Sequence, residues 1–324
     1  MLDRNIDPEK RAALVTHAHQ AIKYGSQSFS AASQLFDNET RERAWLLYAW
    51  CRRCDDIADN QELGGELGDQ SDLDARLALI RKLTAKAFAS EPTGDPAFDA
   101  LGVVAGECGL TPAMAEDVIA GFALDAEDWR PRTEADMMRY CYHVAGAVGV
   151  MMAVVMGVSP NDKDTLDRAN DLGLAFQLSN IARDIVEDDA AGRCYLPVEW
   201  LVEQDIEPGQ HTKPHHRKEL AEMAARLVAL VEKHEAAARV GAERLPFRSR
   251  WAVLSAARIY GAIGRKVRKR GTEAWNSRTY VPRWEKALYG ARAFLSAAIN
   301  REKHPDGPIT WGIADYRPEA PDPA

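Results

Sequence analysis

Several features that define other protein classes are scarce or missing in this 324-residue sequence. Its five cysteines are scattered and odd in number, and no secretory signal precedes them, so we expect free thiols in a reducing compartment. The longest apolar run, residues 144–158, has 15 residues, fewer than the ~20 that a helix needs to span a bilayer. A net charge of −8 argues against a nucleic-acid partner, which would require a basic surface.

Strand-like alternation is also missing, and helical spacing replaces it along most of the chain. No G-x-G-x-x-G follows a strand and no solenoid repeat is present, so we expect no nucleotide requirement. We predict an all-α fold, a single helical domain over residues 1–301, followed by a proline-rich, loosely ordered tail over 302–324. The predicted helices cover about 8–23, 40–60, 72–89, 96–108, 112–127, 134–158, 162–188, 216–243, 248–272 and 283–301.

The stretch CRRCDDIAD at 51–59 places three carboxylates within five positions of an otherwise amphipathic helix. Asp55 and Asp59 are four residues apart and share a helix face, where like charges destabilise by roughly 0.2–0.5 kcal/mol. Either the neighbouring Arg52 and Arg53 or a bound cation would offset this repulsion. The stretch by itself is compatible with a solvated acidic face and with a metal site.

A second polar stripe lies within LGLAFQLSNIARDIVEDDAAGRCYLP, residues 172–197. Gln177, Asn180, Asp184 and Asp188 are spaced by three, four and four, so they share one helical face while apolar residues cover the rest. Mg²⁺ prefers such oxygen ligands, completed by water and substrate phosphates. Two facing stripes of this kind would hold Mg²⁺ against a diphosphate, and adjacent arginines would bind the phosphate oxygens.

Three segments carry a resemblance to a known family. DDIAD, YCYHVAGAVG at 140–149 and GLAFQLSNIARDIVEDDAAGRCYLP at 173–197 closely resemble the squalene and phytoene synthase family, especially its bacterial phytoene synthase branch. The resemblance implies an isoprenoid-synthase helical fold around a central cavity, with both aspartate stripes near one end. It also implies a prenyltransferase of carotenoid biosynthesis that joins two geranylgeranyl diphosphates through prephytoene diphosphate to 15-cis-phytoene. Mg²⁺, or Mn²⁺ in its place, would be the cofactor, and NADPH would not be needed.

The same resemblance assigns roles to individual residues. The residues expected to bind the metal are Asp55, Asp59, Asn180, Asp184 and Asp188. The residues expected to hold the diphosphates are Ser28, Arg52, Arg193, Tyr260 and Arg278. The residues expected to line the reaction zone are Tyr140, Gln177 and Tyr195.

Two alternatives stay open on the sequence. The first is a C30 dehydrosqualene or squalene synthase that uses farnesyl diphosphate; the small residues Ala31, Ala32 and Ser33 would leave space for longer chains and favour C20 substrates. The second is a catalytically silent prenyl-binding scaffold, which the intact carboxylates oppose. The basic run RKVRKR at 265–270 is either a solvated helix face or a contact for phosphate or anionic lipid. With an insoluble product, we expect a cytoplasmic enzyme with peripheral contact at the inner face of the membrane.

Overall fold

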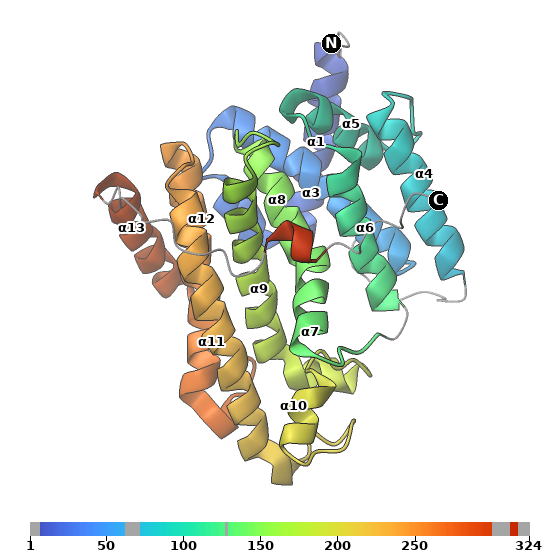
Figure 1. Cartoon of the computed structure of the whole chain (residues 1–324). Coiled ribbons are helices and arrows are strands. Elements are labelled where there is room, and N and C mark those ends of the chain that lie inside the picture. Colours follow the sequence, from blue (N-terminus) through green and yellow to red (C-terminus); the bar gives the residue numbers. More distant parts are fainter. Residues whose placement is uncertain (1–6, 62–71, 127–128, 300–311, 317–324) are drawn as a thin grey trace.

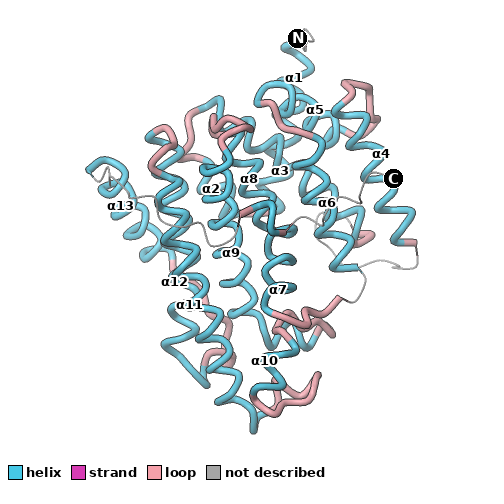
Figure 2. The backbone as a smooth tube through the Cα atoms, viewed as in Figure 1, coloured by secondary structure: helices cyan, strands magenta, loops and turns pink. Residues whose placement is uncertain are grey.

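A computed structural model describes residues 7–61, 72–126, 129–299 and 312–316, without the side chains of 27, 28, 31, 125 and 126. All regular structure in these ranges is helical, and they contain no strand (Figure 2). The predicted all-α class is therefore confirmed.

The predicted helices form close to their expected bounds. The long ones are α1 (Pro8–Gly25), α3 (Asn38–Ala58), α4 (Leu73–Phe88), α5 (Pro96–Cys108), α6 (Pro112–Ala126), α9 (Lys163–Ala190), α11 (Arg217–Ala242), α12 (Phe247–Arg270) and α13 (Arg283–Ile299). The segment predicted as one helix over 134–158 consists of α7 (Glu134–Cys141), the π-helical turn η1 (Tyr142–Gly146) and α8 (Ala147–Val155). The short helices are α2 (Gln27–Ser33), α10 (Val198–Glu203), η2 (Pro214–His216), η3 (Gly271–Glu273) and η4 (Ile313–Asp315).

Side-chain caps explain where two of these helices begin. At α7, Thr133 Oγ1 accepts the Asp136 N–H and Asp136 accepts the Thr133 N–H, which together form a capping box. Helix α3 begins two residues before the predicted residue 40, because Asp37 is the N-cap and accepts the Thr40 N–H at 2.9 Å.

Helix α9 is central and packs against α8, α11 and α12 (Figure 1). The approach of α8 and η1 to α9 depends on glycine. A Cβ atom on Gly173 would lie 2.4 Å from the Ala145 carbonyl oxygen, and one on Gly149 would lie 2.7 Å from that of Ala169. The apolar run is thus part of a closely packed inner helix. The helix Glu134–Val155 is long and apolar enough to cross a membrane, yet 67% of its most apolar window is buried within the fold.

Part of the segment 302–324 packs on the helical body. The Ile313 N–H donates to Asp167 Oδ1 of α9 at 2.8 Å, and the buried Tyr316 ring stacks on Tyr142 with centroids 5.1 Å apart. For residues 312–316 the expectation of a loosely ordered tail does not hold. The remainder of that segment lies outside the described residues.

Candidate active site

Two adjacent carboxylates at the end of α3 bind the same arginine. The Arg52 guanidinium lies 2.9 Å from an oxygen of Asp55 and 2.9 Å from an oxygen of Asp56. Arg53 instead pairs with Asp95, the N-cap of α5, at 2.7 Å. The side chain of Asp56 is 5% exposed and that of Asp55 is 37% exposed. Arg52 therefore offsets the repulsion within this pair, and Asp55 is the more exposed of the two carboxylates, the one that a ligand can reach.

Asp59 closes α3 and connects this stripe electrostatically to α9. Burial raises the pKa of Asp59, and the charges of Arg193 and Arg52 oppose that rise. Arg193, just beyond the C-terminus of α9, also opposes the rise in the pKa of Asp188. The charge of one guanidinium, that of Arg193, thus lowers the pKa of the last carboxylate of each stripe. The ends of α3 and α9 are therefore coupled electrostatically.

The stripe on α9 is partly neutralised by two arginines. Arg183 binds both carboxylate oxygens of Asp184, with its Nε 2.7 Å from Oδ1, and Arg278 approaches Asp184 to 3.1 Å. One turn further on, burial and then the charge of Asp184 raise the pKa of Asp188 to about 6. A cation that binds beside a desolvated carboxylate with a like-charged neighbour stabilises the charged form of that carboxylate.

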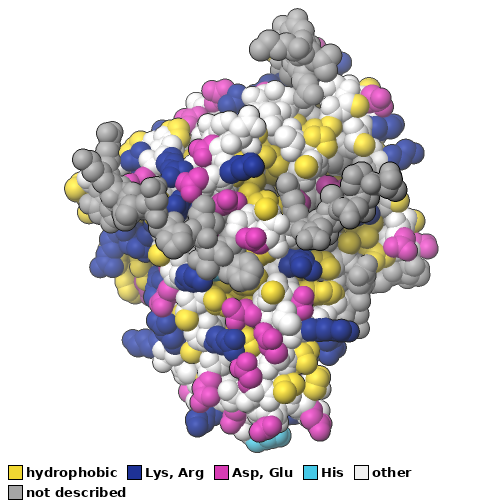
Figure 3. Space-filling view, in the orientation of Figure 1, with side chains coloured by type: hydrophobic (Ala, Val, Ile, Leu, Met, Phe, Trp, Pro, Cys, Tyr) yellow, Lys and Arg dark blue, Asp and Glu magenta, His cyan; other side chains and the backbone are white. Residues whose placement is uncertain are grey.

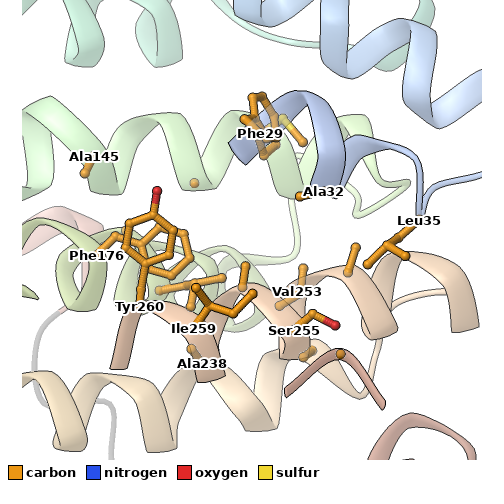
Figure 4. Close-up of a pocket in the computed structure, with 18 of the residues that line it drawn as sticks. Phe29, Ala32, Leu35, Ala145, Phe176, Ala238, Val253, Ser255, Ile259 and Tyr260 are labelled. Carbon is orange, nitrogen blue, oxygen red and sulfur yellow. The ribbon is translucent and has the colours of Figure 1, made fainter. Parts of the chain in front are cut away.

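A cavity of about 1590 Å³ extends from the polar face of α9 between α8, α11, α12 and α13. It exceeds the roughly 300–1,000 Å³ of most small-molecule sites. Figure 4 shows Phe29 and Ala32 of α2 across the cavity from Val253 and Ile259 of α12. The wall from the apolar run comprises Val144, Ala145, Val148, Gly149, Met152, Ala153 and Met156. The polar residues at the α9 end comprise Gln177, Asn180, Arg183, Tyr260 and Arg278.

Aromatic rings meet beside this polar end. Phe176 and Tyr260 stack with centroids 4.0 Å apart and both line the cavity (Figure 4). Burial raises the pKa of the Tyr260 phenol, although the charge of Arg183 opposes the rise. The phenol is therefore neutral at physiological pH and lies within reach of an arginine.

Only some of the predicted site residues line the cavity. Gln177, Asn180, Tyr260 and Arg278 line the cavity. Tyr140 and Tyr195 do not; the buried Tyr140 ring stacks between Tyr195 and Trp129, with centroid distances of 4.8 and 5.2 Å. These two tyrosines form a stacked cluster, and their predicted place in the reaction zone has no support from the cavity lining. The Ser28 side chain lies outside the described part of the chain.

Two features of the site were not predicted as such. Phe176 precedes Gln177 by one position, and its helical spacing does not distinguish it from the core residues Leu174 and Leu178. Arg183 lies in the cavity lining and pairs with the adjacent Asp184; its position in the sequence does not show that it faces a cavity.

The oxygen donors of the two stripes fit a hard cation such as Mg²⁺. Within the described residues, no three His, Cys, Asp or Glu side chains converge on one metal position. Asp55 and Asp184 are instead bound by arginines, whereas Asp59 and Asp188 have raised pKa values. A cation held partly by water and by substrate phosphates needs only one or two carboxylates from each stripe, so the donor chemistry remains suitable.

Most of the basic side chains in the run 265–270 are paired with other groups of the protein. Arg265, Lys266 and Arg268 form ion pairs with glutamates at 2.7 Å, and Arg270 donates to the Ser277 carbonyl at 2.8 Å. These contacts favour the interpretation of the run as a solvated, internally paired helix face.

An all-helical fold whose large apolar cavity ends at arginines paired with an aspartate is typical of an isoprenoid synthase, the class of enzymes that acts on prenyl diphosphates. Comparison with known proteins narrows the class. The chain belongs to the squalene/phytoene synthase family, whose sequence model matches residues 22–285.

Individual relatives agree with this assignment. The chain is 46% identical over 275 residues to a phytoene synthase of Pseudescherichia vulneris, covering 84% of this chain and 88% of that one. It is 46% identical over 303 residues to a 15-cis-phytoene synthase of Enterobacter agglomerans, covering 93% and 98%. Among solved structures, a ligand-bound dehydrosqualene synthase aligns with a TM-score of 0.76 and 26% identity, covering 88% of this chain and 96% of that chain.

The raised pKa of Asp188 predicts a stability change in the metal-free protein. Above its folded-state pKa of about 6, the charged form is disfavoured by the fold, and this cost disappears as the pH falls toward the ordinary value of 3.8. Asp188→Asn should therefore raise the melting temperature at about pH 8, and most of this gain should vanish near pH 4.5. Thermal unfolding of both proteins in a chelator at the two pH values checks it. An equal shift at both pH values, or destabilisation at both, would contradict this account of Asp188.

Proposed function

We propose that the protein is a 15-cis-phytoene synthase that joins two geranylgeranyl diphosphates through prephytoene diphosphate and releases diphosphate, without NADPH. The observation that carries the proposal is the two-part lining of the cavity, which is apolar over most of its length and lined by Asn180, Arg183 and Arg278 at one end. The names of the relatives that are 46% identical support the C20 substrate and the C40 product.

The arginines give the chain a place for the leaving group. Arg183 and Arg278 meet at Asp184 beside the cavity, and guanidinium forks match phosphate oxygens. Positive charge fixed there before the reaction stabilises the negative charge that develops on the diphosphate as the allylic C–O bond ionises. Asp55, Asp59, Asn180, Asp184 and Asp188 would hold Mg²⁺, which when bound supplies further stabilisation of the departing diphosphate.

The apolar part of the cavity would protect the carbocation. The wall from Val144 to Met156 presents small groups, aliphatic groups and the thioethers of two methionines, with no hydroxyl or charged side chain, so it excludes water. The stacked Phe176 and Tyr260 rings at the polar end would stabilise a nearby cation by about 0.5–2 kcal/mol. Burial of prenyl chains at about 0.8 kcal/mol per CH₂ would supply most of the affinity and position the reacting carbons.

The test is product analysis after incubation with each candidate substrate. Purified protein with Mg²⁺ would receive geranylgeranyl diphosphate or farnesyl diphosphate, with and without NADPH, and hydrocarbons would be separated by chromatography. We expect phytoene from the C20 substrate in the absence of NADPH. Preferential formation of a C30 hydrocarbon from farnesyl diphosphate would overturn the assignment in favour of a dehydrosqualene or squalene synthase. No product from either substrate would favour a silent prenyl-binding protein.

A further inference from the structure

Helix α13 exposes an unusually apolar outer face. Of the ten large apolar side chains that are exposed in the described chain, five lie on this one helix. Trp284, Leu288, Leu295 and Ile299 are 67, 41, 55 and 73% exposed. Their spacings of four, seven and four residues place them on a single stripe of the helix. A contiguous apolar stripe on the outside of a protein marks a contact with a partner or with lipid.

The cavity opens beside this stripe. Tyr280, Phe294 and Leu295 line the cavity, yet they are 71, 42 and 55% exposed, so they lie where its wall meets the solvent. On the same helix, Ala287, Gly290 and Ala291 line the cavity with small groups. Figure 1 shows α13 at the outer edge of the molecule, next to α12. The helix therefore separates the cavity from the solvent, and its apolar stripe is continuous with the cavity mouth.

Positive charge is concentrated around the same helices. Residues 239–299 contain 14 lysines and arginines but three acidic residues, a net charge of +11 in a chain whose total is −8. Figure 3 shows Lys and Arg side chains gathered along the edge that Figure 1 assigns to α11, α12 and α13. Such an asymmetry attracts an anionic partner.

Part of this charge is not neutralised by the fold. Arg239 and Arg265 share one buried carboxylate, Glu235, at 2.6 and 2.7 Å. Burial lowers the pKa of Arg258, and the nearby charges of Arg239 and Arg292 lower it further. Arg283 and Arg292, both on α13, have no ion pair within the described residues. The surface beside the apolar stripe thus carries a local excess of guanidinium groups.

We propose that the outer face of α13, formed by Trp284, Leu288, Leu295 and Ile299 with the flanking Arg283 and Arg292, docks on an anionic lipid surface and turns the cavity mouth toward the bilayer. The proposal rests on the proposed function, because a prenyl diphosphate and a hydrocarbon product both partition into lipid. Apolar side chains would enter the interface while the arginines pair with acidic headgroups. A second copy of this chain is a poorer occupant, since a symmetric contact would juxtapose two surfaces of the same positive charge.

The geometry also revises where a membrane contact should lie. The sequence suggested the basic run 265–270, but three of its side chains already pair with glutamates. The α13 face combines exposed apolar groups with arginines that lack such partners. It is therefore this face, rather than the basic run, that should control binding.

The experiment measures flotation of the full chain with vesicles of phosphatidylcholine alone or mixed with phosphatidylglycerol, at low salt. Wild type is compared with Trp284→Gln/Leu288→Gln and with the matched control Tyr24→Gln/Val202→Gln, whose native side chains are 71 and 64% exposed elsewhere on the surface. None of these four residues lines the cavity. We expect wild type and the control to float with the anionic vesicles, and the α13 variant to bind them at least about tenfold more weakly.

Two activity assays separate this proposal from the proposed function. With substrate in detergent, we expect the same turnover rate for wild type, the control and the α13 variant. With substrate in anionic vesicles, we expect the turnover rate of the α13 variant alone to decrease, by about tenfold or more. Inactivity of wild type in detergent would refute the proposed function alone. Absence of vesicle binding by wild type, or equal binding by the α13 variant, would overturn the docking proposal. So would a wild-type dimer that the α13 substitutions convert to monomer, because a second copy would then cover the face.

Discussion

Asp184→Asn is expected to lower turnover by about 100-fold or more while the melting temperature changes by only a few degrees. Asparagine keeps one oxygen that accepts hydrogen bonds, so the shape of the side chain and the contacts at either Oδ1 or Oδ2 are retained, while the contacts at the other position are lost. It does not supply the negative charge that holds a cation against the diphosphate. Asp55→Asn should behave in the same way, because Asp55 is the reachable carboxylate of the α3 pair. The measurement is steady-state phytoene formation at saturating Mg²⁺, together with thermal unfolding in a chelator.

Asp56→Asn is the matched control for this prediction. The Asp56 side chain is buried against Arg52, so its loss weakens a desolvated ion pair and should lower the melting temperature more than Asp55→Asn does. Normal turnover by the Asp55 and Asp184 variants would show that these carboxylates are structural. A large decrease in the melting temperatures of these two variants would also show that the carboxylates are structural.

Ala32→Trp is expected to reduce phytoene formation at least about tenfold and to shift the preference toward farnesyl diphosphate. Ala32 lines the cavity from α2, where a large ring would occupy space that a C20 chain needs (Figure 4). Each buried CH₂ contributes about 0.8 kcal/mol, so losing room for even two of them costs about tenfold in binding. The ratio of kcat/KM for the two diphosphates measures the shift.

Ser30→Trp on the same short helix is the control, because Ser30 does not line the cavity. It should leave the ratio unchanged. An unchanged ratio in Ala32→Trp, with the protein folded, would mean that chain length is selected at another wall. Of the three small residues that the sequence singled out, Ser33 has a structural role: it is buried, and its hydroxyl accepts the Trp45 indole N–H at 2.9 Å.

Most of the helices could be predicted because their apolar periodicity is long and regular. The exceptions have local causes. The helices α2 and α10 have seven and six residues, too short to establish a period. The π turn within Glu134–Val155 leaves the hydrophobic pattern continuous, so the sequence indicates one uninterrupted helix.

The carboxylate stripes could be predicted because positions four residues apart on a helix share a face whatever surrounds them. Which aspartate in CRRCDDIAD is buried could not, since this depends on how α3 packs on its neighbours. The same holds for Arg278, which is 94 positions from Asp184 in the chain and meets it only in the folded protein. The stack of Phe176 on Tyr260 likewise exists only after α9 and α12 pack together.

The most direct test of the site is a crystal structure of the protein with Mn²⁺ and an unreactive thiodiphosphate analogue of the C20 substrate. Anomalous scattering would locate the metal independently of any assumption about its ligands. We predict manganese between Asp55 and Asp59 on one side and Asn180, Asp184 and Asp188 on the other, with the diphosphate against Arg183 and Arg278 and the prenyl chain in the cavity. Manganese bound away from both stripes, or a diphosphate that does not contact these arginines, would contradict the account.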